Sequence, residues 1–340
     1  MNLKTIAKEA GVSTATVSNV INGNYHKVSK ETIEKVLRII EANNYKPNAT
    51  ARSLASKQSR IIGVVIPYVG PDDDFAMSPY NAQMLSLLEN YIRKQGYYLM
   101  ARCVGQVEEV VPLFSTWNVD GMILFGVYKH EVQEIKKKLK VPTVYIDTYA
   151  EEYEISNVGI NDYKGGYLLA KYLLGKGHRE IAFAGPSIQS PGVINERYRG
   201  FCDACREAGV TVTPDHIFEG CTNYQNGVSI GTKIGCDHIA FTAVATMSDV
   251  LAFGIMEGLK LCGKRIPDDV SVIGFDNLRE CDYSTPKLTS ISQNLPQKAL
   301  AVGEQLFSMI QTGETMPANI VVDVEIVERQ SVKELEVTNK

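Results

Sequence analysis

The sequence lacks the features that mark membrane proteins, secreted proteins and several large enzyme classes. It has no run of about eighteen apolar residues, so no transmembrane helix is expected. Its first residues, MNLKTIAKEAG, contain no apolar stretch of the kind found in secretory signals, which favours a cytoplasmic protein. Motifs of dinucleotide, nucleotide, serine-hydrolase and zinc-peptidase sites (G-x-G-x-x-G opening a helix, the P-loop, G-x-S-x-G, H-E-x-x-H) are also missing, so we expect neither an enzyme nor a cofactor.

Cysteine and histidine give no sign of a metal site. The seven cysteines are scattered and odd in number, which favours reduced thiols. Cys202 and Cys205 form a C-x-x-C, but no second ligand pair has suitable spacing, so helix packing explains them better than redox or zinc chemistry. His178 follows a predicted helix end, where a partial positive charge is favourable, and we expect a structural role. The single tryptophan, Trp117, is expected to be packed on a helix.

Residues 3–23, LKTIAKEAGVSTATVSNVING, predict two short helices joined by a tight turn at Gly11. Ser13 can cap the second helix, and Asn22-Gly23 can end it. Apolar residues recur at helical spacing and can close a small core: Ile6, Ala7, Ala10, Val12, Val17, Val20 and Ile21. The outward residues of the second helix are short and uncharged, which suits DNA base edges and phosphates: Thr14, Ala15, Thr16, Ser18 and Asn19. An ordinary helical hairpin is the alternative.

The next residues predict a third helix and a short segment that orders only when it is docked. Ser29 can cap a helix over 30–43 whose apolar face is Ile33, Val36, Leu37 and Ile40. Residues 48–56, NATARSLAS, are too short and polar to be stable alone as a helix. Their one large apolar side chain, Leu54, could enter a minor-groove base step and kink the duplex.

VSTATVSNVING (12–23), followed by YKPNATARSLASKQS (45–59), resembles the DNA-binding head and hinge helix of the LacI/GalR family of bacterial transcription regulators. We therefore expect a helix-turn-helix head over 1–47, a hinge helix over 48–58 and an effector-binding domain over 59–340. DNA contacts are expected at Thr5, Ser13, Thr14, Ala15, Thr16, Ser18, Asn19, Asn22, Tyr45, Asn48, Ala51, Arg52, Leu54 and Ala55.

The distribution of charge supports this division. Residues 1–60 hold ten Lys and Arg against four Glu, which gives a net charge of +6. The whole chain has a net charge of −4, so residues 61–340 have a net charge of −10. A basic head on an acidic body is typical of a nucleic-acid-binding arm on a globular domain. The alternative is a basic face that is merely solvated, which the helical motif in the same residues disfavours.

From residue 61 onward, short apolar runs alternate with helical segments, which predicts doubly wound parallel sheets. About 280 residues exceed one such sheet, so the sequence predicts two lobes, and the cleft between them is the natural place for a small molecule. Predicted strands include 61–66, 97–101, 119–126, 141–147, 179–186, 217–219, 240–246 and 270–276. The fold class is thus a helical head followed by an α/β sensor.

Three further phrases, GHREIAFAGP (177–186), NERYRGF (195–201) and IPDDVSVIGFDN (266–277), resemble the sensor domain of the same family, itself similar to periplasmic sugar-binding proteins. The resemblance implies a ligand-responsive dimer whose chain crosses between lobes near residues 160, 290 and 321. The N-lobe would comprise about 60–160 and 290–320, and the C-lobe about 161–289 and 321–330.

Four residues are expected to bind the effector. Asp276 follows a buried strand, and its carboxylate can accept two hydrogen bonds from a sugar or purine. Arg197 opens a helix, and its planar fork can hold hydroxyls or an acid group. Tyr80 and Ser248 fall where the family places an aromatic and an Asn. The alternatives are a local salt bridge or cap for Arg197 and a turn for Asp276.

These features predict a repressor that senses a small metabolite, most readily a sugar or a sugar derivative. It should bind double-stranded, pseudo-palindromic operator DNA as a homodimer. The tail after Val327, ERQSVKELEVTNK, has too few apolar positions for a tetramerising coil. A metabolite-binding module whose DNA binding is secondary or lost is the alternative, and a steep salt dependence of DNA affinity would distinguish the two.

Overall fold

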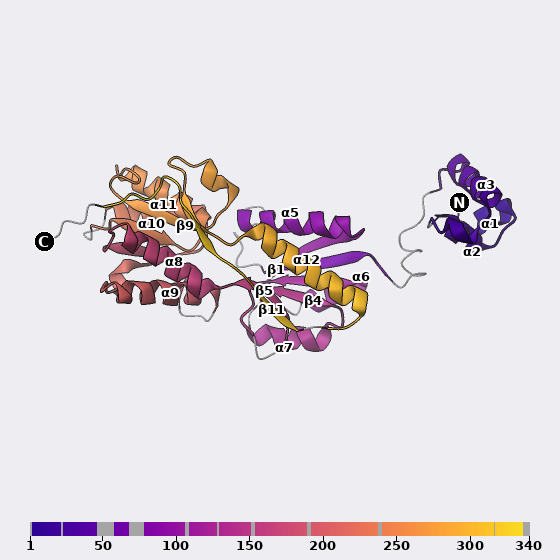
Figure 1. Ribbon diagram of the computed structural model, residues 1–340, viewed down its shortest axis with the longest axis horizontal. Helices are drawn as coiled ribbons and strands as arrows, with labels where there is room; N and C mark the ends of the chain where they lie inside the picture. Colours follow the sequence, from indigo (N-terminus) through magenta and orange to yellow (C-terminus); the bar gives the residue numbers. More distant parts are fainter. Residues whose placement is uncertain are drawn as a thin grey trace. The chain divides into compact units, whose positions relative to one another are not determined.

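The protein is described from a computed structural model covering residues 2–21, 23–45, 58–67, 78–105, 109–127, 129–150, 154–188, 192–236, 240–315 and 317–335. The chain forms two compact units, residues 1–59 and 60–340, and each is described by itself (Figure 1). The predicted hinge helix lies outside the described residues except for its last residue, Gln58.

The first unit is a bundle of three helices, α1 (Leu3–Ala10), α2 (Thr14–Ile21) and α3 (Lys30–Ala42), with a 3₁₀ turn at Tyr25–Lys27. Gly11 adopts the predicted left-handed conformation, with φ of 72°. Ser13 and Ser29 accept hydrogen bonds from the backbone N–H groups of Thr16 and Thr32 at 3.1 and 3.3 Å, as helix N-caps do. Both caps and the turn are therefore confirmed.

The predicted apolar face of α3 is wrong at one position. Leu37 is exposed, and Ile39 packs against the core in its place. The core of this unit is centred on Val36, which is fully buried. At about 100° per residue, Ile39 lies roughly 60° from Val36 around the helix, whereas Leu37 lies roughly 100° away.

In the second unit, a six-stranded parallel sheet forms the N-lobe, in the order β11-β5-β4-β3-β1-β2. Its strands are β1 (Ile61–Pro67), β2 (Tyr98–Val104), β3 (Gly121–Phe125), β4 (Thr143–Ile146), β5 (Ser156–Ile160) and β11 (Ala318–Val322). Successive side chains of a strand point to opposite faces, so each face packs a different pair of helices. One face packs against α5 (Pro79–Lys94) and α12 (Leu295–Thr312), the other against α6 (Val110–Trp117) and α7 (Lys129–Lys138) (Figure 1).

The C-lobe repeats this plan. Its sheet has the order β12-β10-β9-β8-β6-β7, with only β12 antiparallel. Its strands are β6 (Ile181–Gly185), β7 (Ile217–Glu219), β8 (Ala243–Thr246), β9 (Ser271–Asp276), β10 (Thr289–Ser292) and β12 (Glu325–Val327). One face packs against α8 (Asp162–Gly175) and α9 (Val193–Glu207), the other against α10 (Tyr224–Gly235) and α11 (Asp249–Leu261). The predicted doubly wound, two-lobed fold is confirmed.

Three segments connect the lobes. The chain leaves the N-lobe after β5, returns from β10 through α12, and leaves again between β11 and β12. The carboxyl ends of β4, β5, β9 and β10 therefore lie near these crossings. In open α/β sheets, ligands bind outside the carboxyl ends of the strands.

One further sequence-based expectation is wrong, and a second, the structural role of His178, is right for a different reason. Trp117, expected to be packed, is the last residue of α6 and its side chain is 57 % exposed. His178 does not carry a favourable positive charge at a helix end, because burial lowers its pKa and disfavours the charged ring. Its ring is fully buried and contacts the Thr242 hydroxyl at 3.0 Å and the Lys333 carbonyl at 3.2 Å, which is a structural role.

Candidate functional site

The first unit presents α2 as a short polar surface. Thr14 and Ala15 are exposed, while Thr16, Ser18 and Asn19 are partly buried. Val17 and Val20 are buried in the core and Ile21 packs against it, so the polar side chains lie on the other side of the helix. This is the arrangement in which a recognition helix offers its N-terminal residues to the major groove.

Some of the predicted DNA-contact hydroxyls also hold the helices in place. Ser13 and Thr16 share a hydrogen bond of 2.9 Å, and the Thr5 hydroxyl donates to the Asn2 side chain at 3.0 Å. Tyr45 packs against the core of this unit. Asn22, Asn48, Ala51, Arg52, Leu54 and Ala55 lie outside the described residues.

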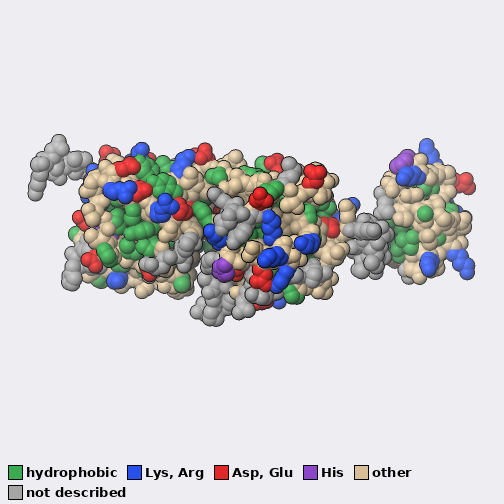
Figure 2. Space-filling model, turned by 90° about the horizontal axis from the view of Figure 1, so that it is seen from below, with side chains coloured by type: hydrophobic (Ala, Val, Ile, Leu, Met, Phe, Trp, Pro, Cys, Tyr) green, Lys and Arg blue, Asp and Glu red, His purple; other side chains and the backbone are tan. Residues whose placement is uncertain are grey.

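Basic side chains are exposed on the same unit. Figure 2 shows Lys and Arg on the surface of the first unit, and all six that are described between residues 2 and 45 are exposed: Lys4, Lys8, Lys27, Lys30, Lys35 and Arg38. Cationic side chains gain affinity for DNA by displacing counterions from its phosphates. The unit therefore combines a polar helix with an exposed surface on which six cationic side chains outnumber four anionic ones.

In the second unit, two aspartates occupy equivalent positions in the two lobes. Asp147 follows β4 in the N-lobe, and Asp276 ends β9 in the C-lobe. Both have a positive φ, 54° for Asp147 and 119° for Asp276, which is rare for residues with a side chain. Backbone strain of this kind persists where the surrounding structure holds it, and it clusters at binding sites.

A buried lysine links Asp147 to the segment that crosses between the lobes. Lys298 of α12 is fully buried, and its Nζ lies 2.7 and 2.6 Å from the two carboxylate oxygens of Asp147. The same Nζ contacts Tyr80 Oη and Gln293 Oε1, both at 3.0 Å. Tyr80 in turn donates to Asp147 at 3.1 Å. Burial, followed by the charge of Asp147, raises the pKa of Tyr80 well above its ordinary value, so its hydroxyl stays protonated.

Gln293 extends this network to the C-lobe. Its Nε2 donates to Asp276 Oδ1 at 2.6 Å, so the path from Tyr80 to Asp276 runs through hydrogen bonds alone. Burial raises the pKa of Asp276 to about 6, and nearby Arg197 opposes that shift. This carboxylate therefore titrates just below neutral pH.

Arg197 is held by the C-lobe and by the start of α8. Its Nε donates to Asp162 Oδ1 at 2.7 Å, and its Nη1 donates to the Met247 carbonyl at 2.9 Å. The guanidinium lies 3.7 Å from the centre of the Phe275 ring, a cation–π contact. Tyr149, from the N-lobe, donates to the other oxygen of Asp162 at 2.6 Å. The Arg197–Asp162 pair thus carries a direct contact between the lobes.

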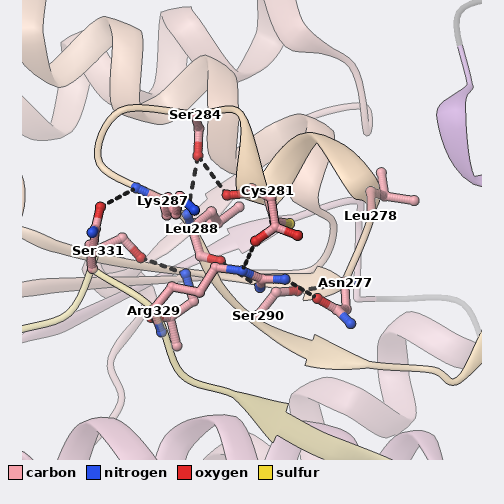
Figure 3. A network of polar contacts seen from close by, with 12 residues as sticks. Asn277, Leu278, Cys281, Ser284, Lys287, Leu288, Ser290, Arg329 and Ser331 are labelled. Atoms are coloured by element: carbon pink, nitrogen blue, oxygen red, sulfur yellow. Dashed lines mark hydrogen bonds and ion pairs between the residues drawn. The ribbon is translucent and has the colours of Figure 1, made fainter.

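A second layer fixes the strained turn after β9. Asp249 accepts hydrogen bonds from the Leu278 N–H at 2.7 Å and the Ser290 hydroxyl at 2.6 Å, and burial raises its pKa to about 8. Figure 3 shows the adjoining contacts, in which Arg329 donates to Asn277 Oδ1 at 2.8 Å and to the Leu288 carbonyl at 2.9 Å. These bonds hold the backbone on which Asp276 is carried.

Ser248 has a defined local role. Its Oγ accepts the Leu251 N–H at 3.2 Å and caps α11, and the side chain is nearly buried. A hydroxyl that accepts a hydrogen bond as a cap can still donate one to a ligand, so ligand contact stays a prediction for this residue.

A cavity of about 210 Å³ lies between the lobes beside these residues. Both lobes contribute to its wall, including Asp147, Tyr149, Asn157, Asp162, Glu196 and Asn319. None of the four predicted ligand residues lines it, but Tyr80 and Arg197 are bonded to Asp147 and Asp162, which do. Tyr80 and Arg197 thus lie directly behind the cavity wall, one in each lobe, and Asp276 is joined to the wall through Gln293 and Lys298.

Sequence reasoning missed Asp147 and Lys298. Asp147 ends VPTVYID as Asp276 ends VSVIGFD, so the argument used for one would have found the other. Lys298 carried no signal, because a lysine on a helix is ordinarily solvated and its helix was not predicted.

The comparisons with known proteins agree with this arrangement. Residues 2–48 match the model of bacterial regulatory proteins of the lacI family, and residues 170–332 match a periplasmic binding protein-like domain. The chain is 32 % identical over 98 % of its length to the HTH-type transcriptional repressor PurR of Mannheimia succiniciproducens, covering 99 % of that protein. It is 33 % identical to the PurR of Vibrio cholerae, covering 98 % of both chains.

This chain belongs to the lacI family. A solved lac repressor dimer, bound to operator and an anti-inducer, superposes with a TM-score of 0.86 at 25 % identity, over 98 % of this chain and 99 % of that one. A lacI-family regulator from Enterococcus faecium with bound ribose gives a TM-score of 0.71 at 28 % identity, over 81 % of this chain and 100 % of that one.

Like these relatives, the lacI-family chain described here is a ligand-responsive, DNA-binding transcription regulator. The predicted family, fold and general function are confirmed. None of the helices in the described ranges is long and apolar enough to cross a lipid bilayer.

Proposed function

We propose that this protein is a repressor that binds a pseudo-palindromic operator as a homodimer. Its affinity for the operator falls or rises when a small metabolite binds in the interlobe cleft. The observation that carries the proposal is the buried polar path from Tyr80 through Lys298 and Gln293 to Asp276, which joins the two lobes. A ligand that rearranges this path changes how the lobes contact each other. The protein is expected to act in the cytoplasm, with its head, hinge and sensor divided near residues 47 and 58.

The chemistry of the cleft favours a neutral, hydroxyl-rich effector such as a sugar. Its two cations, Arg197 and Lys298, are already paired with Asp162 and Asp147. Glu196 in the cavity wall and Asp276 behind it add two further carboxylates, so negatively charged side chains outnumber the two cations that could hold an anionic ligand. Carboxylates accept hydrogen bonds from the adjacent hydroxyl groups of a sugar, whereas their negative charges would repel a phosphate.

A thermal-shift screen tests this assignment. Neutral sugars, their phosphates and nucleobases are added separately to the full-length protein, and a ligand that binds only the folded state raises the melting temperature by mass action. We expect a neutral sugar to give the largest shift and its phosphate to give none. A larger shift with the phosphorylated sugar would overturn the proposed effector chemistry.

Asn19 is expected to read one base pair of the operator. Asn19→Ala should weaken binding to the preferred operator by about 1–3 kcal/mol and change the preference at one position of each half-site, because an asparagine amide can bind an adenine edge bidentately. Fluorescence anisotropy with a set of single-base operator variants measures both effects. Asn24→Ala, in the same unit but outside α2, is the matched control. Equal weakening on every sequence would instead make Asn19 a phosphate contact.

A dimer without a tetramerising coil is expected. A hollow on the C-lobe combines apolar residues with charged and hydroxyl-bearing ones, and Tyr283 in its wall is 73 % exposed. Its lining residues are Tyr224, Phe253, Met256, Glu257, Lys260, Glu280, Tyr283, Ser284 and Thr285. The lac repressor, similar over nearly its whole length, is a dimer, so we assign this surface to a second copy of the chain. Tyr283→Asp should convert the dimer to a monomer in sedimentation at micromolar concentration, while the equally open Leu261→Asp should not. A wild-type monomer or stable tetramer would contradict this.

A further inference from the structure

Two cysteines far apart in the sequence lie in contact at the ends of neighbouring helices. Cys236 follows the last residue of α10, Cys262 follows the last residue of α11, and their sulfurs are 3.1 Å apart. Cys236 is exposed and Cys262 partly exposed, so small reagents can reach the pair. A disulfide needs a sulfur separation of about 2.05 Å, so these sulfurs need to approach by only about 1 Å.

Close helix packing brings the two sulfurs together. Glycines let the backbones of α10 and α11 touch, and an added Cβ at Gly231 would lie 2.3 Å from the Ile255 carbonyl oxygen. At the end of the helix pair, a Cβ on Gly235 would lie 2.8 Å from the Cys262 Cβ. The two helices also lie side by side in Figure 1. The contact between the thiols therefore follows from the packing of the two helices at whose ends they lie.

We propose that Cys236 and Cys262 form a reversible redox site that a peroxide oxidises to a disulfide. The thiolate of Cys236 attacks one oxygen of hydrogen peroxide, the O–O bond breaks, and a sulfenic acid and hydroxide result. The sulfur of Cys262 then attacks the Cys236 sulfur, and the departing hydroxide takes up the Cys262 proton as water. Two thiols thus lose two electrons and two protons, and peroxide becomes two waters. A dithiol reverses the reaction by exchange.

The environment of the two sulfurs fits these roles. The hydrogen bond with Cys236 raises the pKa of Cys262, which keeps it a thiol at neutral pH and suits the second, resolving step. Cys236 is the more exposed of the two residues, so a reagent from solvent meets it first. The disulfide would join the ends of α10 and α11 on the C-lobe, away from the cleft at the start of α11.

The C-x-x-C of the sequence does not share these properties. Cys205 is fully buried in the core between α8 and α9, and burial raises its pKa to about 12. Burial likewise raises the pKa of Cys202. Thiols of this kind are inert towards peroxide, so this pair serves as the internal control.

The test is peroxide treatment of the reduced, full-length protein, followed by alkylation of free thiols and peptide mapping. We expect a single cross-linked pair, 236 with 262, a loss of two of the seven free thiols, and full recovery with dithiothreitol. Cys236→Ser and Cys262→Ser should give no cross-link, whereas the double variant Cys202→Ser/Cys205→Ser should cross-link as the wild type does. Persistence of both thiols under peroxide, or a dominant cross-link between other cysteines, would overturn the proposal.

The melting temperature provides a second test, because the disulfide would close a loop of the chain between residues 236 and 262. The oxidised wild type should melt about 3–8 °C higher than the reduced form, because the cross-link restricts the unfolded chain. Cys236→Ser should melt at the same temperature with and without peroxide. An oxidised wild type that melts lower than the reduced form would show that the bond strains the helix pair, and the site would not be the one inferred here.

Discussion

Asp276→Asn is expected to lower effector affinity by about 10- to 100-fold while leaving operator binding without effector within threefold of the wild type. The substitution keeps the size of the side chain and removes the charge that strengthens its hydrogen bonds to hydroxyl groups. Isothermal titration with the sugar that gives the largest thermal shift measures the first quantity, and operator anisotropy measures the second. The matched control is Asp323→Asn, which removes a carboxylate whose side chain is 90 % exposed.

The same carboxylate should make effector binding depend on pH. Burial raises the pKa of Asp276 to about 6, so the charged form is lost as the pH falls through that value. Effector affinity of the wild type should therefore weaken between pH 7 and pH 5, and that of Asp276→Asn should change little. An effector response that survives Asp276→Asn unaltered would remove this residue from the site.

Leu54→Ala is expected to have the opposite effect to Asp276→Asn, with operator binding impaired and effector binding retained. Leu54 lies outside the described residues, and its assignment rests on the sequence, where it is the one large apolar side chain of the hinge segment. Its truncation should weaken operator binding and leave effector affinity without DNA nearly unchanged. Loss of effector binding in Leu54→Ala would contradict the separation of switch and site.

Lys298→Met is expected to destabilise the sensor by about 3–5 kcal/mol. Removing one partner of a buried pair leaves the other charge uncompensated, here Asp147, and also deprives Tyr80 and Gln293 of a hydrogen-bond partner. Urea unfolding followed by circular dichroism measures the loss. The double variant Lys298→Met/Asp147→Leu should recover most of it, because both charges then disappear together.

An exposed pair in the same unit supplies the control. Lys164 and Asp323 lie 2.8 Å apart, with side chains 43 % and 90 % exposed, so Lys164→Met should cost less than about 1 kcal/mol. If Lys298→Met lowers the free energy of unfolding no more than Lys164→Met does, the buried network does not stabilise the contact between the lobes.

The general architecture was predictable because its signals are local. Caps at Ser13 and Ser29, the turn at Gly11 and the alternation of apolar strands with helices each depend on a few neighbouring residues. The errors at Leu37 and Trp117, and in the reason given for the role of His178, arose where tertiary contacts decide burial, which no periodicity reveals.

The site was predictable only in part, for a related reason. Asp276 and Arg197 could be found because each stands at an element boundary that the pattern marks. Lys298 could not, because its role depends on burial against Asp147, which lies 151 residues away in the chain. The contact between Cys236 and Cys262 depends equally on two helices packing together, which no local pattern in the sequence marks.

The most direct test of the regulator is operator affinity measured with and without the sugar that gives the largest thermal shift. Fluorescence anisotropy of a selected operator fragment, titrated with full-length protein, should show a change in affinity of about 5- to 150-fold when the sugar is saturating. By linkage, the operator should change the affinity for the sugar by the same factor. A sugar that binds tightly in the cleft yet leaves operator affinity unchanged would contradict the account.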